Sequence, residues 1–223
     1  MYRRAAIASM LLIGATMAPA AHAVGVTTYG VGLESCKSYL EARQEAGAGQ
    51  VAFVDWLSGY FSGVNKTSTH RNNFFGLSDL NGAMTWLDAY CNVRPQVHFA
   101  EAAGIMVLNA KPGPAAHSID EVSYGSADKS CGVYLEVREQ RDVIYRDAAG
   151  EFTNWLGGYL SGVNAISLRT NNVLGSAELS DAVSWLERYC GAHPLVSFAK
   201  AVDALVLEQQ PRYASQSGSP AAR

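Results

Sequence analysis

Cysteine and histidine are the residues of this chain whose side chains could bind a metal or act as nucleophile and base. After residue 23 they are Cys36, Cys91, Cys131 and Cys190, with His70, His98, His117 and His193. The cysteines are far apart and lack the closely spaced Cys or His partners of zinc sites. The sequence contains no nucleophile elbow, phosphate-binding loop or His-Glu-x-x-His stretch. It therefore predicts no catalytic residue, no metal site and no cofactor.

An internal repeat organises the chain. The stretch 56–65 returns as 155–164, and the stretch 86–91 returns as 185–190, both at an offset of 99 residues. Between Phe53 and Leu108, 26 of 56 aligned positions are identical, and upstream the offset becomes 95. All four tryptophans and all four cysteines occupy equivalent positions, whereas no histidine has an equivalent histidine. The chain therefore consists of two copies of one module.

The duplication selects one of the three possible cysteine pairings. A module that closed its own disulfide before duplication predicts Cys36–Cys91 and Cys131–Cys190. A disulfide that closes a loop of this length contributes on the order of 4 kcal/mol to stability in the chain-entropy model. A covalent link of this kind suits a module of roughly 80 residues, whose core is small.

The apolar residues recur at helical spacing, which predicts an all-α fold of two tandem four-helix modules. In the first copy we expect a short helix near Cys36, a helix through the apolar stripe 53–64, and a helix over 78–91 capped by Ser78. A fourth helix is expected to begin at Pro95, because proline suits the first turn.

Glycines stand beside the tryptophan-bearing stripe in both copies. A glycine inside a helix costs about 1 kcal/mol relative to alanine, so a repeated pair predicts close approach of another backbone. Packing within one module is the default interpretation, and a dimerisation surface is the alternative. The predicted helix-packing residues are Trp56, Gly59, Tyr60, Gly63, Trp155, Gly158, Tyr159 and Gly162.

Asparagines are the polar residues that recur most densely. They lie in the loop after each glycine-bearing helix: Asn65, Asn72, Asn73, Asn164, Asn171 and Asn172. Asparagine tolerates left-handed backbone and bonds locally, so turn and cap roles are the default interpretation. A binding loop is the alternative.

The beginning of the chain resembles a secretory signal. Two arginines at positions 3 and 4 precede an apolar run and Ala21-His22-Ala23, where we place the cleavage site. The predicted organisation is a signal peptide over 1–23, helical repeats over 24–108 and 124–208, a Pro/Gly linker over 109–123 and a disordered tail over 209–223. No later stretch is long and apolar enough for a membrane span. The expected location is the periplasm or the exterior.

Removal of Arg3 and Arg4 leaves 15 Lys and Arg (17 minus 2) against 20 Asp and Glu, a charge of about −5. That balance argues against a nucleic-acid partner, which requires clustered basic residues. A protein partner is expected instead.

The recurring cysteine, tryptophan, glycine and proline positions resemble those of HdeA/HdeB-type periplasmic proteins. They are Cys36, Trp56, Gly59, Tyr60, Cys91 and Pro95, and again Cys131, Trp155, Gly158, Tyr159, Cys190 and Pro194. The latter half of each repeat also resembles the Tai-type immunity proteins of type VI secretion. The first resemblance implies an acid-activated chaperone and the second a toxin-binding protein, both non-enzymatic and both tending to dimerise. This chain departs from both families by fusing two domains.

These features together predict an exported, non-enzymatic protein-binding module. The alternatives are an acid-stress chaperone, an immunity protein that binds a secreted toxin, a secreted enzyme of unrecognised type and a structural envelope component. Two copies of a dimerising domain on one chain can also pack as an intramolecular pseudo-dimer.

Overall fold

The computed structural model describes residues 25–68, 80–110, 124–140 and 143–216. Within these ranges the fold is all-α, as predicted, and each repeat contributes one 3-10 turn and four helices. The first repeat contains η1 (Gly30–Leu33), α1 (Cys36–Glu45), α2 (Ala48–Thr67), α3 (Leu80–Val93) and α4 (Phe99–Asn109). The second contains η2 (Gly125–Asp128), α5 (Cys131–Glu139), α6 (Val143–Ile166), α7 (Leu179–Ala192) and α8 (Phe198–Gln216).

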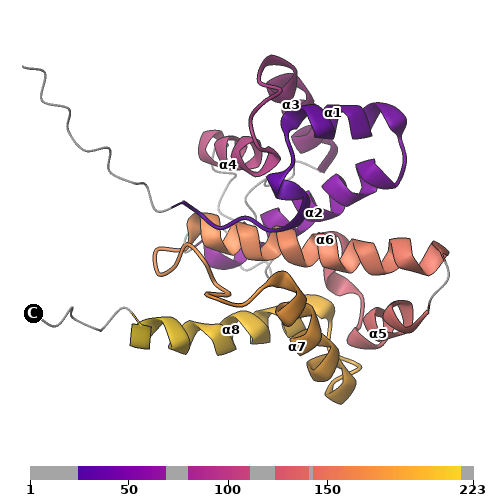
Figure 1. Cartoon of the computed structure of the whole chain (residues 1–223), viewed down its shortest axis with the longest axis vertical. Helices are drawn as coiled ribbons and strands as arrows, with labels where there is room; N and C mark the ends of the chain where they lie inside the picture. Colours follow the sequence, from indigo (N-terminus) through magenta and orange to yellow (C-terminus); the bar gives the residue numbers. More distant parts are fainter. Residues whose placement is uncertain (1–24, 69–79, 111–123, 141–142, 217–223) are drawn as a thin grey trace, which may run out of the picture.

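The long helices α2 and α6 cross between the two repeats (Figure 1), with α1, α3 and α4 on one side and α5, α7 and α8 on the other. The predicted signal peptide, linker residues 111–123 and the capping position Ser78 lie outside the described residues.

Both predicted disulfides are present. Cys36–Cys91 joins α1 to α3, and Cys131–Cys190 joins α5 to α7. All four cysteines are fully buried, so each bond lies inside the core of its own repeat.

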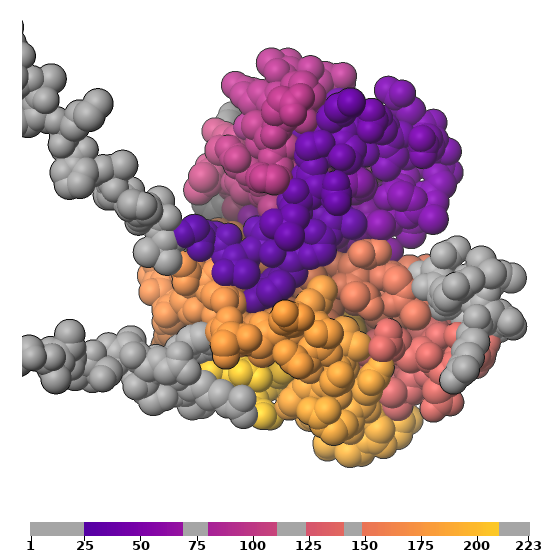
Figure 2. Space-filling model, viewed as in Figure 1, coloured from indigo at the N-terminus to yellow at the C-terminus, as the bar shows by residue number. Residues whose placement is uncertain are grey.

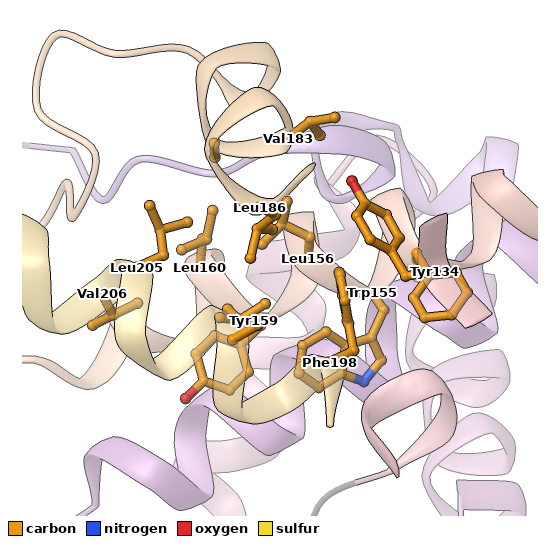
Figure 3. Close-up of a cluster of buried hydrophobic side chains, with 14 of the residues drawn as sticks. Tyr134, Trp155, Leu156, Tyr159, Leu160, Val183, Leu186, Phe198, Leu205 and Val206 are labelled. Carbon is orange, nitrogen blue, oxygen red and sulfur yellow. The ribbon is translucent and has the colours of Figure 1, made fainter. Parts of the chain in front are cut away.

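Each repeat has its own aromatic core. The predicted stripe of α2, which contains Trp56 and Tyr60, is buried, and Phe99 of α4 packs against it. The Trp56 and Tyr60 rings stack with centroids 5.1 Å apart. Figure 3 shows the equivalent cluster of the second repeat, where Trp155 and Tyr159 stack at the same 5.1 Å spacing. The helical periodicity therefore identified the buried face correctly.

The fourth helix of each repeat does not begin at its proline, contrary to the prediction. Helices α4 and α8 begin at Phe99 and Phe198, after a turn. The carbonyl groups of that turn serve another element, because Lys37 N donates to Pro95 O (2.9 Å) and Cys36 N to Val97 O (2.7 Å). The first N–H groups of a helix lack intrahelical partners, and residues 95–97 satisfy two of those of α1.

The disordered tail was predicted to begin too early. Helix α8 continues to Gln216, so residues 209–216 of the predicted 209–223 tail are helical, and residues 217–223 lie outside the described range. The small and polar composition of this stretch suggested disorder, but a helix already docked on a core can extend at little nucleation cost.

Candidate functional site

The repeated glycines lie where α2 and α6 cross. A Cβ atom at Gly59 would overlap the Trp155 carbonyl and lie 2.9 Å from Tyr159 N. A Cβ at Gly158 would overlap the Trp56 carbonyl in the same way, and Gly63 and Gly162 form a second matched pair. The backbone that approaches these glycines therefore belongs to the other repeat, so the default interpretation of packing within one module was wrong. We call this arrangement the glycine contact.

Two tyrosine backbones bridge the repeats beside the glycine contact. Trp56 Nε1 donates to Tyr29 O (2.7 Å), and Tyr29 N donates to Ser161 Oγ (2.9 Å) in the opposite repeat. In the second repeat Trp155 Nε1 donates to Tyr124 O (2.6 Å), and Tyr124 N donates to Ser62 Oγ (3.0 Å). The tryptophans thus belong both to the cores and to the contact between repeats.

Asparagines of the second repeat hold the start of the first, but the loop prediction was wrong for one of them in each repeat, because Asn65 lies in α2 and Asn164 in α6. Asn164 Nδ2 donates to Thr27 O (2.8 Å), and Asn172 Oδ1, in the loop after α6, accepts from the Tyr29 hydroxyl (2.6 Å). Asn171 Nδ2 donates to Gly25 O (3.1 Å). Figure 2 shows these first described residues, in indigo, lying on the orange surface of the second repeat.

The remaining predicted loop asparagines lie in the first repeat. Asn65 is buried, at 2% exposed, whereas Asn72 and Asn73 lie outside the described residues. The asparagines that the structure describes are thus engaged by or buried within this chain itself, which accords with a structural role for them.

Two repeated acids are not free surface charges. Charged residues on exposed helix faces are usually solvated, but Arg43 Nη2 lies 2.9 Å from Asp88 Oδ2. Arg138 Nε donates to Glu187 Oε1 at 2.9 Å. Each pair joins the first helix of a repeat to the third, beside the disulfide, so these recurring charges orient α1 on α3 and α5 on α7.

A carboxyl group of unusual environment lies at the edge of the α2–α6 contact. Asp55 is partly buried, and its Oδ2 has no hydrogen-bond partner among the described residues. It borders a notch of about 360 Å³ together with Glu151 and Asn154, the residue equivalent to Asp55 in the second repeat. Burial, with the nearby Glu151 carboxylate, raises the pKa of Asp55 from 3.8 to about 7, while Lys129 opposes the shift.

Because the pKa of Asp55 is higher folded than unfolded, its ionisation weakens the fold as the pH rises from about 4 to about 7. Asp55→Asn, which copies Asn154, is expected to stabilise the protein by about 1–2 kcal/mol at pH 8 and by much less at pH 4. Urea unfolding at both pH values measures this difference. Asp128→Asn, which removes a carboxylate at an exposed position, is the matched control. An equal gain at both pH values would contradict the assignment.

Stacked aromatic side chains of α3 and α7 lie at the edge of each core, partly buried against it. Trp86 and Tyr90 are half-buried with ring centroids 5.1 Å apart, and the Arg94 guanidinium lies 4.7 Å from the Tyr90 ring centre. We call these three residues the first aromatic ladder. The second ladder is Trp185, Tyr189 and His193, with centroid spacings of 5.0 and 4.3 Å.

These ladders were not among the residues predicted from the sequence. Their signal is the spacing of four residues, Trp86 to Tyr90 to Arg94, which recurs one repeat later. Trp86, Tyr90 and Arg94 form one row along α3, and the buried Ala83, Leu87 and Cys91 form another. Helical spacing alone would therefore have distinguished the ladder from the buried face.

Comparison with protein-family models, curated proteins and solved structures finds no match to this chain. Within the described ranges there is no group of three His, Cys, Asp or Glu residues able to hold a metal ion. In that same part of the chain no helix has the length and apolar character to cross a membrane. His70 and His117 lie outside it.

Proposed function

We propose that this chain is an exported, non-enzymatic protein-binding module whose binding surface includes the two aromatic ladders. The observation that carries the proposal is the repetition of Trp and Tyr, stacked and partly exposed, on the third helix of each repeat. Trp, Tyr and Arg are the residues most enriched among energetic hot spots of protein interfaces. Both disulfides are compatible with the periplasm or the exterior.

The aromatic rings of the ladders are held in place without a partner, which suits recognition. Stacking and the Arg94 contact hold the rings in place before any partner arrives, so little side-chain entropy remains to be lost on binding. In the second ladder Trp185 Nε1 also donates to Glu208 Oε2 (3.1 Å), which ties the indole to α8.

We further infer that the repeats form an intramolecular pseudo-dimer. Its support is the reciprocity of the contacts, since Gly59 meets Trp155 as Gly158 meets Trp56, and Tyr29 and Tyr124 bridge the repeats in the same manner. An approximate two-fold relation of this kind would present the two ladders as a matched pair on one rigid body.

The Asp55 notch does not favour the acid-stress chaperone alternative. A dissociating chaperone needs acid to weaken the contact between its domains. Protonation of Asp55 removes its repulsion with Glu151 beside the α2–α6 contact, so at this position acid strengthens the fold. The carboxylates that would open the protein at low pH would have to lie elsewhere.

The proposal is tested by affinity capture from a periplasmic extract, at neutral and at acid pH. Trp86→Ala with Tyr90→Ala, and Trp185→Ala with Tyr189→Ala, are expected to reduce recovery of a protein retained by the original chain by about tenfold or more. Val93→Ala, at the end of α3, and Leu195→Ala, in the turn after α7, are matched controls, because these side chains are 73% and 94% exposed. Thermal unfolding verifies that each variant is folded. Equal recovery by folded ladder variants would contradict the proposal.

A further inference from the structure

The two repeats differ at one internal site next to the glycine contact. In the second repeat the Tyr159 hydroxyl donates to Asp203 Oδ1, and Lys66 Nζ lies 2.9 Å from Asp203 Oδ2. Helix α8 thus supplies an acceptor for the tyrosine, and α2 of the first repeat supplies the charge that balances it. Tyr159, Asp203 and Lys66 are thus joined in one polar group at this site.

The equivalent positions of the first repeat are Tyr60, Gly104 and Ala165. Neither the carboxylate nor the ammonium group is present, and a cavity of about 430 Å³ lies there instead, lined by all three residues. A Cβ atom at Gly104 would lie 3.5 Å from the Tyr60 hydroxyl oxygen. That hydroxyl has no hydrogen-bond partner among the described residues, although Tyr60 is only 2% exposed.

The cavity is lined mainly by apolar side chains. Leu33 and Ile105 lie where the second repeat has Asp128 and Ala204. Val26, Leu33 and Leu108 are 50%, 56% and 78% exposed around it. Besides Tyr60, its polar lining residues are Thr28, His98, Glu101 and Ser161. Two of them have partners already, since Ser161 Oγ donates to Gly157 O (2.7 Å) and His98 Nδ1 lies 2.6 Å from Leu33 O.

We propose that this cavity binds a small, uncharged and largely apolar molecule whose carbonyl oxygen accepts a hydrogen bond from Tyr60. The carbonyl would take the place that the Asp203 carboxylate has beside Tyr159. A volume of about 430 Å³ is within the range of small-molecule sites, about 300–1,000 Å³.

The residues that differ between the two repeats at this site indicate that the ligand is uncharged. An anion at the Asp203 position is balanced by Lys66 in the second repeat, but Ala165 offers no such partner in the first. Burying an unpaired carboxylate is costly, whereas a neutral carbonyl oxygen needs only one donor. Burial also raises the pKa of Tyr60 above its ordinary value, so the hydroxyl remains protonated and able to donate.

The test adds 2-heptanone, the neutral probe, or heptanoate, its charged counterpart, to the isotopically labelled full chain. Binding is measured from the changes in amide chemical shifts. We expect 2-heptanone to shift the Gly104 amide in a saturable manner, and heptanoate to bind roughly tenfold or more weakly. Gly104→Asp, which restores the residue of the second repeat, should abolish binding. Tyr60→Phe, which preserves the ring, should weaken it several-fold.

The converse variant is a matched control. Asp203→Gly with Lys66→Ala should open the second site and add saturable shifts around residue 203. Absence of a saturable Gly104 shift, or unchanged binding by folded Gly104→Asp or Tyr60→Phe, would overturn the proposal, and equal affinity for heptanoate would overturn the neutral ligand class. The ladder variants should still bind 2-heptanone, so this site and the proposed protein-binding surface stand or fall separately.

Discussion

Gly59→Ala and Gly158→Ala are each expected to lower the free energy of unfolding by about 3 kcal/mol or more. A Cβ at either position would overlap a main-chain carbonyl of the opposite helix, which cannot rotate away as a flexible side chain can. The helices α2 and α6 must then separate, and the tyrosine bridges beside them lengthen. Urea denaturation followed by tryptophan fluorescence measures the loss, because Trp56 and Trp155 lie at this contact.

Two other glycines of α6 provide matched controls. A Cβ at Gly150 meets nothing within 4 Å, so Gly150→Ala should stabilise the helix by about 0.5–1 kcal/mol. A Cβ at Gly157 would lie 3.5 Å from Tyr29 O, an ordinary contact, so Gly157→Ala should change stability little. If Gly59→Ala behaved like Gly150→Ala, the close approach of α2 and α6 would be wrong.

Loss of either disulfide is expected to cost about 4 kcal/mol. The bonds close loops of 55 and 59 residues by sequence separation, and the chain-entropy model assigns nearly equal contributions to loops of such similar length. Cys36→Ala with Cys91→Ala, and Cys131→Ala with Cys190→Ala, test the two bonds separately. Urea denaturation at neutral pH measures both pairs of variants.

The paired substitutions serve as controls for each other. Because the repeats share the glycine contact, removal of one bond should lower the stability of the whole chain in a single transition. Non-reducing peptide mapping of the original chain should find only the two bonds within repeats. A bond between repeats, or two separate unfolding transitions in which the unaltered repeat keeps its full stability, would contradict this view.

The sequence by itself determined the elements and covalent links of each repeat. Helical periodicity identified the buried face of α2, because side chains three and four residues apart lie on the same side of a helix. Duplication determined the cysteine pairing, since only pairs within a module are available to both copies. The buried helix face is a local property, and the cysteine pairing is a property of a single module. The residues of each module are therefore sufficient to encode both.

The tertiary structure decided what the repeated features contact. The glycines predicted close backbone approach, but only the packed helices show that Gly59 meets Trp155 of the other repeat. Helical spacing specifies which side of α2 packs against another element, but it does not specify which element that is. In the same way, the asparagine loop showed a turn composition but gave no sign that Asn172 would bind Tyr29, 143 residues away.

The cavity beside Tyr60 also depended on the tertiary structure. In the aligned sequences Gly104 and Ala165 are two unremarkable differences from Asp203 and Lys66, separated by 61 positions (165 minus 104). Packing of α4 and α6 around Tyr60 brings both differences to one cavity. Contacts between distant parts of the chain form only when apolar faces are buried together, so sequence spacing could not reveal that these two substitutions open a single site.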